Sequence, residues 1–335
     1  MNSKFTVAWM FRKRQPFYFS IEKVFDLIEP NIKQHHVDIQ RVYMQRHKVL
    51  PGTILKNILF ARNVKANLYH ITGDVHYLAL GLPSSKTILT IHDCVFMYQT
   101  RGIKRMLLHF LFLKWPVKRS RIVTTISERT RQDIIRFTNC SPDKIVVIGN
   151  PLDERFEAQP YVFNKSCPVI LFIGITPNKN LFRVIEALEG ITCCLHIIGR
   201  IPEAEKEQLQ KKHIDFKESY ELSDEEIKDA YIKSDMLLFP SLFEGFGLPV
   251  IEAQNIGRPV ITSNIEPMSE VAGDAACLVD PYSVKSIREG VCQIIESDEY
   301  RTTLISKGLS NVQRYRPEII AARYVALYDQ IQSAS

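Results

Sequence analysis

The chain lacks long apolar runs, paired cysteines and a recognisable leader segment. No stretch of its 335 residues approaches the roughly 18 apolar residues that a membrane-spanning helix needs. The seven cysteines include no C-x-x-C pair, which is typical of reduced thiols and not of a disulfide framework or a zinc site. The short run VAWMF precedes a basic cluster instead of following one, unlike a signal peptide. We therefore expect a cytoplasmic protein, at most peripheral on the inner face of the membrane.

Basic residues are concentrated in the first half of the chain. Residues 1–150 contain 24 Lys and Arg against 9 Asp and Glu; since the whole chain has 43 and 37, the remainder has 19 against 28. A half this basic is expected to face an anionic partner. A membrane surface and a phosphorylated acceptor are the candidates, whereas nucleic acid is disfavoured because no recognition motif for it is present.

Short runs rich in Val and Ile alternate with helical patterns in two consecutive series. Strands that are apolar throughout are typical of parallel sheets with helices on both faces. We expect an α/β protein with two Rossmann-like domains facing each other across a cleft. The expected domains are residues 1–155 and 156–316, joined near the polar segment LDERFEAQPYVFNKSCP. A last helix, over residues 317–335, could pack on either domain.

One segment, FPSLFEGFGLPVIEA at residues 239–253, combines the features of a ligand site. Its buried strand is followed by a glycine-rich turn, and Pro249 suits the first turn of a helix. Such a turn lets backbone N–H groups approach a phosphate. Glu244 could then accept hydroxyls of a sugar, and the two oxygens of Glu252 match the diol of a ribose. The alternative is an ordinary strand-to-helix turn, because acidic residues near a helix N-terminus are common without any ligand.

The E-x7-E spacing of Glu244 and Glu252 resembles the signature of retaining glycosyltransferases of family 4, the mannosyltransferase-like glycosyl transferases of group 1 with the GT-B fold. Four more segments fit that family: IVVIGNPLDERF, VILFIGITPNKNLFRVIEAL, LSDEEIKDAYIKSDMLLFPS and RPVITSNIEPMSEVAGDAACLVDP. The N-terminal half fits mainly through TILTIHD and IVTTISERTRQDI. The resemblance implies a nucleotide-sugar donor and a saccharide or lipid-linked acceptor.

The resemblance also assigns roles to individual residues. Glu244 would contact the donor sugar, Glu252 the nucleotide ribose, and Lys179 the leaving diphosphate. His92, at the end of TILTI, would reach the donor sugar across the cleft and is, with Glu244 and Lys179, a candidate catalytic residue. The expected donor-binding residues are Gly174, Asn178, Lys179, Gly199, Tyr220, Leu222, Glu244, Gly245, Phe246, Gly247, Leu248 and Glu252.

Each of these roles has a structural alternative. Lys179 could be a solvated loop lysine, and His92 could end a strand without touching a ligand. The phosphate loop also departs from the family, whose members often carry a second cation where this chain has Asn178-Lys179-Asn180. Arg183 or Arg200 could supply the missing cation.

No D-x-D pair and no cluster of His, Cys and carboxylates is present in the sequence, so no metal and no cofactor are expected. The predicted activity is metal-independent, retaining transfer of a hexose from a GDP- or UDP-sugar in bacterial surface polysaccharide, lipopolysaccharide or glycolipid biosynthesis. The alternative is a catalytically weak or inactive nucleotide-sugar-binding, membrane-associated scaffold protein. An epimerase of the same fold is disfavoured by the E-x7-E signature.

Two basic and aromatic segments are candidates for the acceptor or membrane side. Between Phe11 and Ser20, where the family usually has glycines, the chain has none, and Phe17, Tyr18 and Phe19 follow a basic cluster. Residues 101–121 flank an apolar run with Lys and Arg, which fits either a buried helix with solvated ends or a membrane-interface helix. The candidate residues are Arg12, Lys13, Arg14, Lys104, Arg105 and Trp115.

Overall fold

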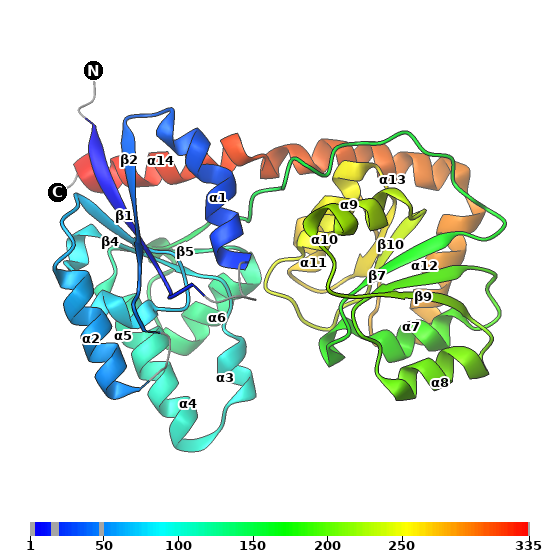
Figure 1. Ribbon diagram of the computed structural model, residues 1–335, viewed down its shortest axis with the longest axis horizontal. Helices are drawn as coiled ribbons and strands as arrows, with labels where there is room; N and C mark the ends of the chain where they lie inside the picture. Colours follow the sequence, from blue (N-terminus) through cyan, green and yellow to red (C-terminus); the bar gives the residue numbers. More distant parts are fainter. Residues whose placement is uncertain (1–3, 15–19, 47–49, 334–335) are drawn as a thin grey trace. The chain divides into compact units, whose positions relative to one another are not determined.

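The computed structural model describes residues 4–14, 20–46 and 50–333, which form two α/β units (Figure 1). The first unit comprises Met1–Pro151 together with Pro317–Ser335, and the second comprises Leu152–Arg316. The division follows Pro151, a few residues before the boundary expected from the sequence, and the C-terminal helix belongs to the first unit. The aromatic residues Phe17, Tyr18 and Phe19 lie outside the described residues.

Within the described residues, the first unit contains a parallel sheet of six strands in the order β2-β1-β3-β4-β5-β6. The strands are β1 (Phe5–Phe11), β2 (Val37–Tyr43), β3 (Leu68–Ile71), β4 (Thr87–Ile91), β5 (Ile122–Thr125) and β6 (Ile145–Val147). The α-helices are α1 (Ser20–Lys33), α2 (Pro51–Arg62), α3 (Val95–Gln99), α4 (Gly102–Leu108), α5 (Trp115–Arg119), α6 (Glu128–Thr138) and α14 (Pro317–Ser333). Short helical turns lie at η1 (His76–Leu80), η2 (Ser84–Lys86), η3 (His109–Lys114) and η4 (Pro142–Lys144).

Both faces of the first sheet are covered, which explains why its strands are apolar throughout. Successive side chains of β1 point to opposite faces. Val7 and Trp9 join the core formed with α1 and α14, whereas Ala8 and Met10 join the core formed with α2, η1 and α5. Helices α1 and α14 lie side by side in Figure 1 and pack against each other.

Helix α14 is tied to the first sheet by a buried chain of hydrogen bonds. The indole N–H of Trp9 donates to the Tyr328 hydroxyl at 3.0 Å. That hydroxyl lies 2.7 Å from Nδ1 of His70, whose Nε2 lies 2.7 Å from Oγ1 of Thr90. Because an indole N–H can only donate, the Tyr328 O–H is left to donate to Nδ1, and the proton of His70 then sits on Nε2. The last helix thus completes the interior of a unit that begins more than 300 residues earlier.

The second unit has a parallel sheet of six strands, again within the described residues, in the order β12-β11-β10-β7-β8-β9. The strands are β7 (Val169–Ile173), β8 (Cys194–Ile198), β9 (Asp215–Ser219), β10 (Met236–Phe239), β11 (Val260–Ser263) and β12 (Cys277–Val279). The helices are α7 (Leu181–Leu188), α8 (Glu203–Lys211), α9 (Asp224–Ile232), α10 (Leu248–Ile256), α11 (Met268–Ala272), α12 (Val284–Glu296) and α13 (Asp298–Asn311), with short turns at η5 (Pro177–Lys179) and η6 (Val312–Tyr315).

The strand order creates a switch point in each sheet. The second sheet grows from β7 in both directions, toward β8 and β9 on one side and toward β10, β11 and β12 on the other. The turns that follow β7 and β10 therefore leave the carboxyl edge as neighbours and diverge. Open α/β sheets bind ligands at such points. In the first sheet the corresponding point lies between β1 and β3.

The apolar stretch at residues 101–121 is not one continuous α-helix. Helix α4 passes into the wide turn η3 and then into α5. Pro116 has no N–H to donate, and the neighbouring N–H of Trp115 reaches back five residues to the carbonyl of Phe110. The two halves of the stretch also differ in burial: Ile103 is exposed, whereas Leu113 is fully buried.

Candidate functional site

Two turns of the second unit meet at its switch point through Lys179 and Glu244. Lys179 lies in the turn after β7, and Glu244 lies in the turn after β10. Their Nζ and Oε1 atoms are 2.7 Å apart, and the side chains are 17% and 15% exposed. The ammonium also lies 4.5 Å from the ring centroid of Phe239. The structure thus brings two of the predicted catalytic residues into direct contact.

Gly174 makes room for this lysine. It has a positive φ of 89°, and a Cβ built on it would lie 2.9 Å from Cε of Lys179. Only a residue without a side chain both adopts this backbone conformation readily and leaves the lysine in place. Gly174 is therefore explained by its contact with Lys179.

The two asparagines beside Lys179 hold the loops together. The amide of Asn178 donates to the carbonyl of Phe243 at 2.9 Å and lies 3.4 Å from Oε1 of Glu244. Asn180 is buried and donates to the carbonyls of Pro240 and Pro281. Both asparagine side chains thus make hydrogen bonds within the protein, and Lys179 provides the only positive charge of the Asn-Lys-Asn segment.

The helix after the second turn begins without a capping side chain. Gly247 occupies the N-cap of α10 with a φ of 117°, and Pro249 lies in the first turn. The hydroxyl of Ser241, at the start of the turn, is buried and has no hydrogen-bond partner within the described residues. Phe246 is buried, and its ring packs against the ring of Tyr315, which holds the turn in place. A helix start of this kind favours an anion.

Glu252 is fixed by a buried tyrosine. Its Oε2 accepts a hydrogen bond of 2.6 Å from the hydroxyl of Tyr231. Burial, and then the charge of Glu252, raise the pKa of Tyr231 far above its ordinary value, so the phenol remains a donor. The carboxylate of Glu252 is therefore oriented before any ligand is present.

The remaining predicted donor-site residues lie at the same edge of the second sheet. Gly199 follows β8 with a φ of 141°, and Tyr220 and Leu222 follow β9. Arg200 lies 4.5 Å from the ring centroid of Tyr220. Since the strands are parallel, the turns after β7, β8, β9 and β10 share one edge. The predicted donor residues lie in these turns, except Leu248 and Glu252, which lie in α10.

Of the two arginines considered as a second cation, Arg183 is nearer to Lys179 along the chain. Its Nη1 donates to Oδ1 of Asn180 at 2.9 Å, within the first turn of α7. Arg200 is exposed and pairs with Glu221 at 3.6 Å.

In the first unit, His92 lies directly after β4. Its Nε2–H donates to the carbonyl of Thr72 at 2.7 Å. Burial lowers the pKa of His92 from its ordinary value, so the ring is neutral at pH 7. Gly73 is needed beside it, because a Cβ there would lie 2.8 Å from Cδ2 of the imidazole. Its Nδ1 has no partner within the described residues and is the atom left to accept a hydrogen bond.

The basic cluster at the end of β1 is partly neutralised. Arg12 forms ion pairs with Glu22 and with Asp74, which follows β3 at the switch point of the first sheet. Burial opposes its charge, but the two carboxylates together raise the pKa of Arg12. Arg14 donates to the hydroxyl of Tyr43 at 3.0 Å, whereas Lys13 is exposed. The sequence-based reasoning did not single out Glu22 or Asp74, although acidic residues are scarce in this half of the chain.

The remaining acceptor or membrane candidates and two further histidines of the first unit differ in exposure. Lys104, Arg105 and Trp115 are exposed on α4 and α5. His70 and His76 are buried and bonded within the core, which makes them structural.

Within the described ranges, no group of three or more His, Cys, Asp and Glu residues is arranged to hold a metal ion. Among the helices of residues 4–14, 20–46 and 50–333, none is both long and apolar enough to cross a membrane.

Two family models match consecutive parts of the chain. The model described as Glycosyltransferase Family 4 matches residues 22–156, and the model described as Glycosyl transferases group 1 matches residues 153–310. The O-antigen chain mannosyltransferase B of Escherichia coli is 24% identical over 80% of this chain and 75% of its own length. The O-antigen chain mannosyltransferase RfbU of Salmonella typhimurium is 30% identical over 68% of this chain and 65% of its own.

Solved structures resemble the chain over nearly its whole length. Sucrose-phosphate synthase from Thermosynechococcus elongatus aligns with a TM-score of 0.77 at 16% identity, covering 98% of this chain and 100% of that one. Anabaena HepE in complex with UDP aligns with a TM-score of 0.76 at 14% identity, covering 97% and 100%. These similarities confirm the expected GT-B fold.

Proposed function

The chain belongs to the group 1 glycosyltransferases of family 4, and we propose that it transfers mannose from GDP-mannose to a hydroxyl of a saccharide or lipid-linked acceptor. The choice of mannose rests on the two relatives named above, which are both called O-antigen mannosyltransferases. The proposed setting is the assembly of lipopolysaccharide or a similar surface glycan, on the cytoplasmic side of the membrane.

The contact between Lys179 and Glu244 at the switch point carries this proposal. An arriving diphosphate would compete with Glu244 for the ammonium of Lys179. The released carboxylate could then accept hydroxyls of the donor sugar. In this way one ion pair of the unliganded protein would separate into a diphosphate contact and a sugar contact.

Two features beside this pair complete the proposed donor site. The uncapped start of α10 favours the diphosphate, and Glu252, held by Tyr231, presents a carboxylate to the ribose. Lys179 would stabilise the leaving nucleoside diphosphate, so the proposed reaction uses no metal. Retention of the anomeric configuration is proposed by analogy with the family.

The first test is the loss of transfer in Glu244→Ala. Purified protein is incubated with GDP-mannose, UDP-glucose and UDP-N-acetylglucosamine, each with a lipid extract, and released nucleoside diphosphate is measured. We expect release with GDP-mannose, almost none with Glu244→Ala, and full release with Glu207→Ala, which removes an exposed carboxylate from α8. Turnover like that of the parent protein in Glu244→Ala would overturn the proposed site.

Two further measurements test the finer claims. Activity should persist after dialysis against EDTA, and the anomeric proton of the product should show the configuration of the donor. An inverted product would refute the retaining mechanism, and EDTA-sensitive activity restored by a divalent cation would refute metal independence. If a donor binds by calorimetry but no panel member is turned over, the scaffold alternative is favoured.

Membrane association is proposed from the exposed apolar residues of α4. Ile103, Met106 and Leu107 are 74%, 51% and 52% exposed, and Lys104 and Arg105 lie among them. Large apolar side chains interleaved with cations suit the boundary of an anionic bilayer.

Sedimentation with vesicles tests this surface. Vesicles containing phosphatidylglycerol should bind the protein at low salt and release it at high salt. Ile103→Ser with Met106→Ser should weaken binding at least tenfold, whereas Ile319→Ser, on exposed Ile319 of α14, should not. Absence of low-salt binding by the parent protein would refute the idea.

A further inference from the structure

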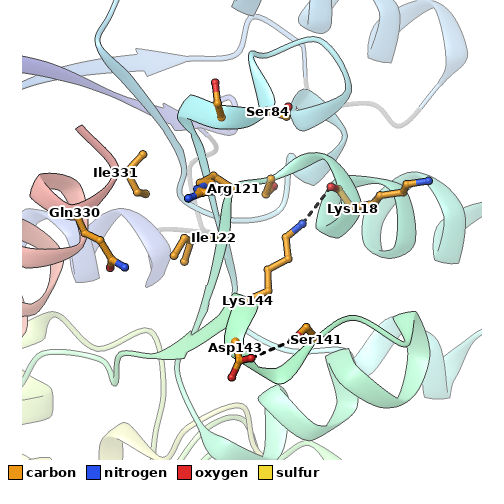
Figure 2. A pocket seen from close by; sticks show the side chains of 11 residues that line it. Ser84, Lys118, Arg121, Ile122, Ser141, Asp143, Lys144, Gln330 and Ile331 are labelled. Carbon is orange, nitrogen blue, oxygen red and sulfur yellow. Dashed lines mark hydrogen bonds between the residues drawn. The ribbon is translucent and has the colours of Figure 1, made fainter. Parts of the chain in front are cut away.

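The first unit has a pocket of about 660 Å³ at the edge of its sheet opposite to His92 (Figure 2). Its lining comes from the residues just before β4, β5 and β6 and from the end of α14. Because β4 spans five residues, the pocket and His92 are separated by the length of that strand, about 15 Å. The pocket is therefore not part of the site at the carboxyl edge.

Three cations line this pocket against one carboxylate. They are Lys118, Arg121 and Lys144, and the carboxylate belongs to Asp143. Figure 2 shows the ammonium of Lys144 reaching toward the backbone of Lys118, whose carbonyl accepts its hydrogen bond at 3.1 Å. Among the residues that the structure describes, the side chains of Lys118 and Arg121 make no hydrogen bond or ion pair.

Two of these cations, Arg121 and Lys144, are close enough to repel each other. Burial lowers the pKa of Lys144, and the positive charge of Arg121 adds to this effect, whereas the Cys140 thiol opposes it. Asp143 is turned toward Ser141, whose hydroxyl donates to it at 3.5 Å. Like charges brought together in this way are unfavourable, and a bound anion would remove the repulsion.

We propose that this pocket binds phosphate or a phosphate monoester. Arg121 offers a planar fork of donors that matches phosphate oxygens, and Lys144 adds a point charge. The hydroxyls of Ser84 and Ser85 line the same pocket and supply neutral donors.

The pocket also reaches the last helix of the chain. Gln330 and Ile331 of α14 form one wall beside Arg121 and Ile122 (Figure 2). A phosphate bound there would link α14 to the starts of β5 and β6. Because a ligand that binds only the folded state stabilises it, occupancy should protect the first unit from unfolding.

The test measures phosphate binding with the donor site disabled. Protein carrying Lys179→Ala is titrated with inorganic phosphate at constant ionic strength, by calorimetry and by thermal unfolding. We expect saturable binding, a rise in the melting temperature, and a Kd that increases at least tenfold on adding Arg121→Gln. The matched control is Lys56→Gln, which removes an exposed cation from α2 and should leave the Kd unchanged.

Two further binding measurements distinguish a soluble phosphate ester from a lipid headgroup. One uses glycerol 3-phosphate, and the other uses phosphatidylcholine vesicles with and without phosphatidic acid. Weaker binding of glycerol 3-phosphate alone by Arg121→Gln identifies a soluble ester, and weaker binding of both identifies a lipid headgroup as well. Equal affinities of the Arg121→Gln protein and its parent for phosphate, ester and vesicles would overturn the proposal, as would the absence of saturable phosphate binding.

Discussion

The ammonium of Lys179 and the carboxylate of Glu244 hold each other in place across two turns of the second unit. Each is partly shielded from water, so their attraction is stronger than that of an exposed pair, which contributes little. Lys206 and Glu218 form a pair of similar length, 2.8 Å, elsewhere in the same unit. The two pairs allow a role in donor binding to be separated from a role in stability.

Lys179→Ala should weaken binding of the nucleoside diphosphate roughly 10- to 100-fold. The expected magnitude is that of one or two charge-assisted hydrogen bonds, about 1.5–3 kcal/mol. Calorimetric titration with GDP and UDP measures it. Lys206→Ala, which breaks the comparison pair, should leave the affinity unchanged; equal losses in both variants would show that the effect is structural.

His70 should make the first unit sensitive to acid. Burial lowers its pKa to about 3, while the unfolded chain has the ordinary value of 6.5. Below pH 6.5 the unfolded state therefore binds a proton that the folded state does not bind, and the free energy of unfolding falls as the pH drops toward 3. Between pH 6.5 and pH 3 the free energy of unfolding should fall by about 5 kcal/mol, with a limiting slope of about 1.4 kcal/mol per pH unit.

Chemical denaturation between pH 7 and pH 4 measures this slope. His70→Gln should flatten it, and His213→Asn, at an exposed position of positive φ in the second unit, should not. Burial also lowers the pKa values of His76 and His92, so the stability of His70→Gln should still depend on pH to some extent. A profile that is the same with and without His70 would contradict the prediction.

At the scale of elements, the turn after β7 is built around Gly174. Gly190 provides a comparison, since it also has a positive φ, of 72°, but has open space where a Cβ would go. Alanine at either position carries the strain of a left-handed backbone, about 1–2 kcal/mol. Only at Gly174 would the new Cβ displace the lysine.

Gly174→Ala and Gly190→Ala should therefore lose similar amounts of stability but differ in donor binding. We expect Gly174→Ala to weaken GDP binding at least tenfold, because Lys179 must leave its place beside Glu244. Thermal unfolding and calorimetry on the two proteins measure both quantities. Equal donor affinities would show that the position of Lys179 does not matter.

The sequence predicted most strands because they are apolar on both faces, and it missed elements that break this pattern. Strand β9, DFKES, lies at the edge of its sheet and carries charges. Helix α2 has apolar residues on more than one face: Ile58 and Ala61 pack in the core, whereas Leu55 and Leu59 are exposed. Asn57 is buried on the core side and donates to the hydroxyl of Tyr77. Periodicity of apolar residues cannot reveal a helix of this kind.

The sequence could predict where the candidate donor residues lie, because each group of them belongs to one short segment that follows a strand. Glu244 and Glu252 belong to one turn and its helix, and Lys179 to another. The partner of Glu252 could not be predicted, because Tyr231 reaches it from α9 and its role depends on three-dimensional packing. The same holds for Asp74, which meets Arg12 only through the pairing of β1 with β3.

At the scale of the whole molecule, the chain leaves its first unit at Pro151 and returns to it at Pro317. The returning helix α14 contributes Tyr324 and Tyr328 to the core of the first unit. The first unit is therefore discontinuous in sequence, and its stability should depend on a segment that follows the whole second unit.

Tyr328→Phe should destabilise the first unit selectively. The change removes the acceptor of the Trp9 indole and the partner of His70, leaving buried polar groups unpaired at a cost of about 2–4 kcal/mol. Hydrogen exchange should become faster in β1, β3 and β4 but not in β7 or β10. Tyr282→Phe, at a side chain that is 60% exposed, is the control. Uniformly faster exchange in both units would contradict the discontinuous description.

The returning helix has a consequence for how the protein is made. A ribosome releases the strands of the first unit early, yet α14 emerges only after the second unit has been synthesised. During that interval the core that Trp9 of β1 and Phe25 of α1 share with α14 lacks that helix, while the core of the second unit is made of its own residues. The nascent chain would thus complete its second half before its first, and the exposed early half is where a chaperone would be needed.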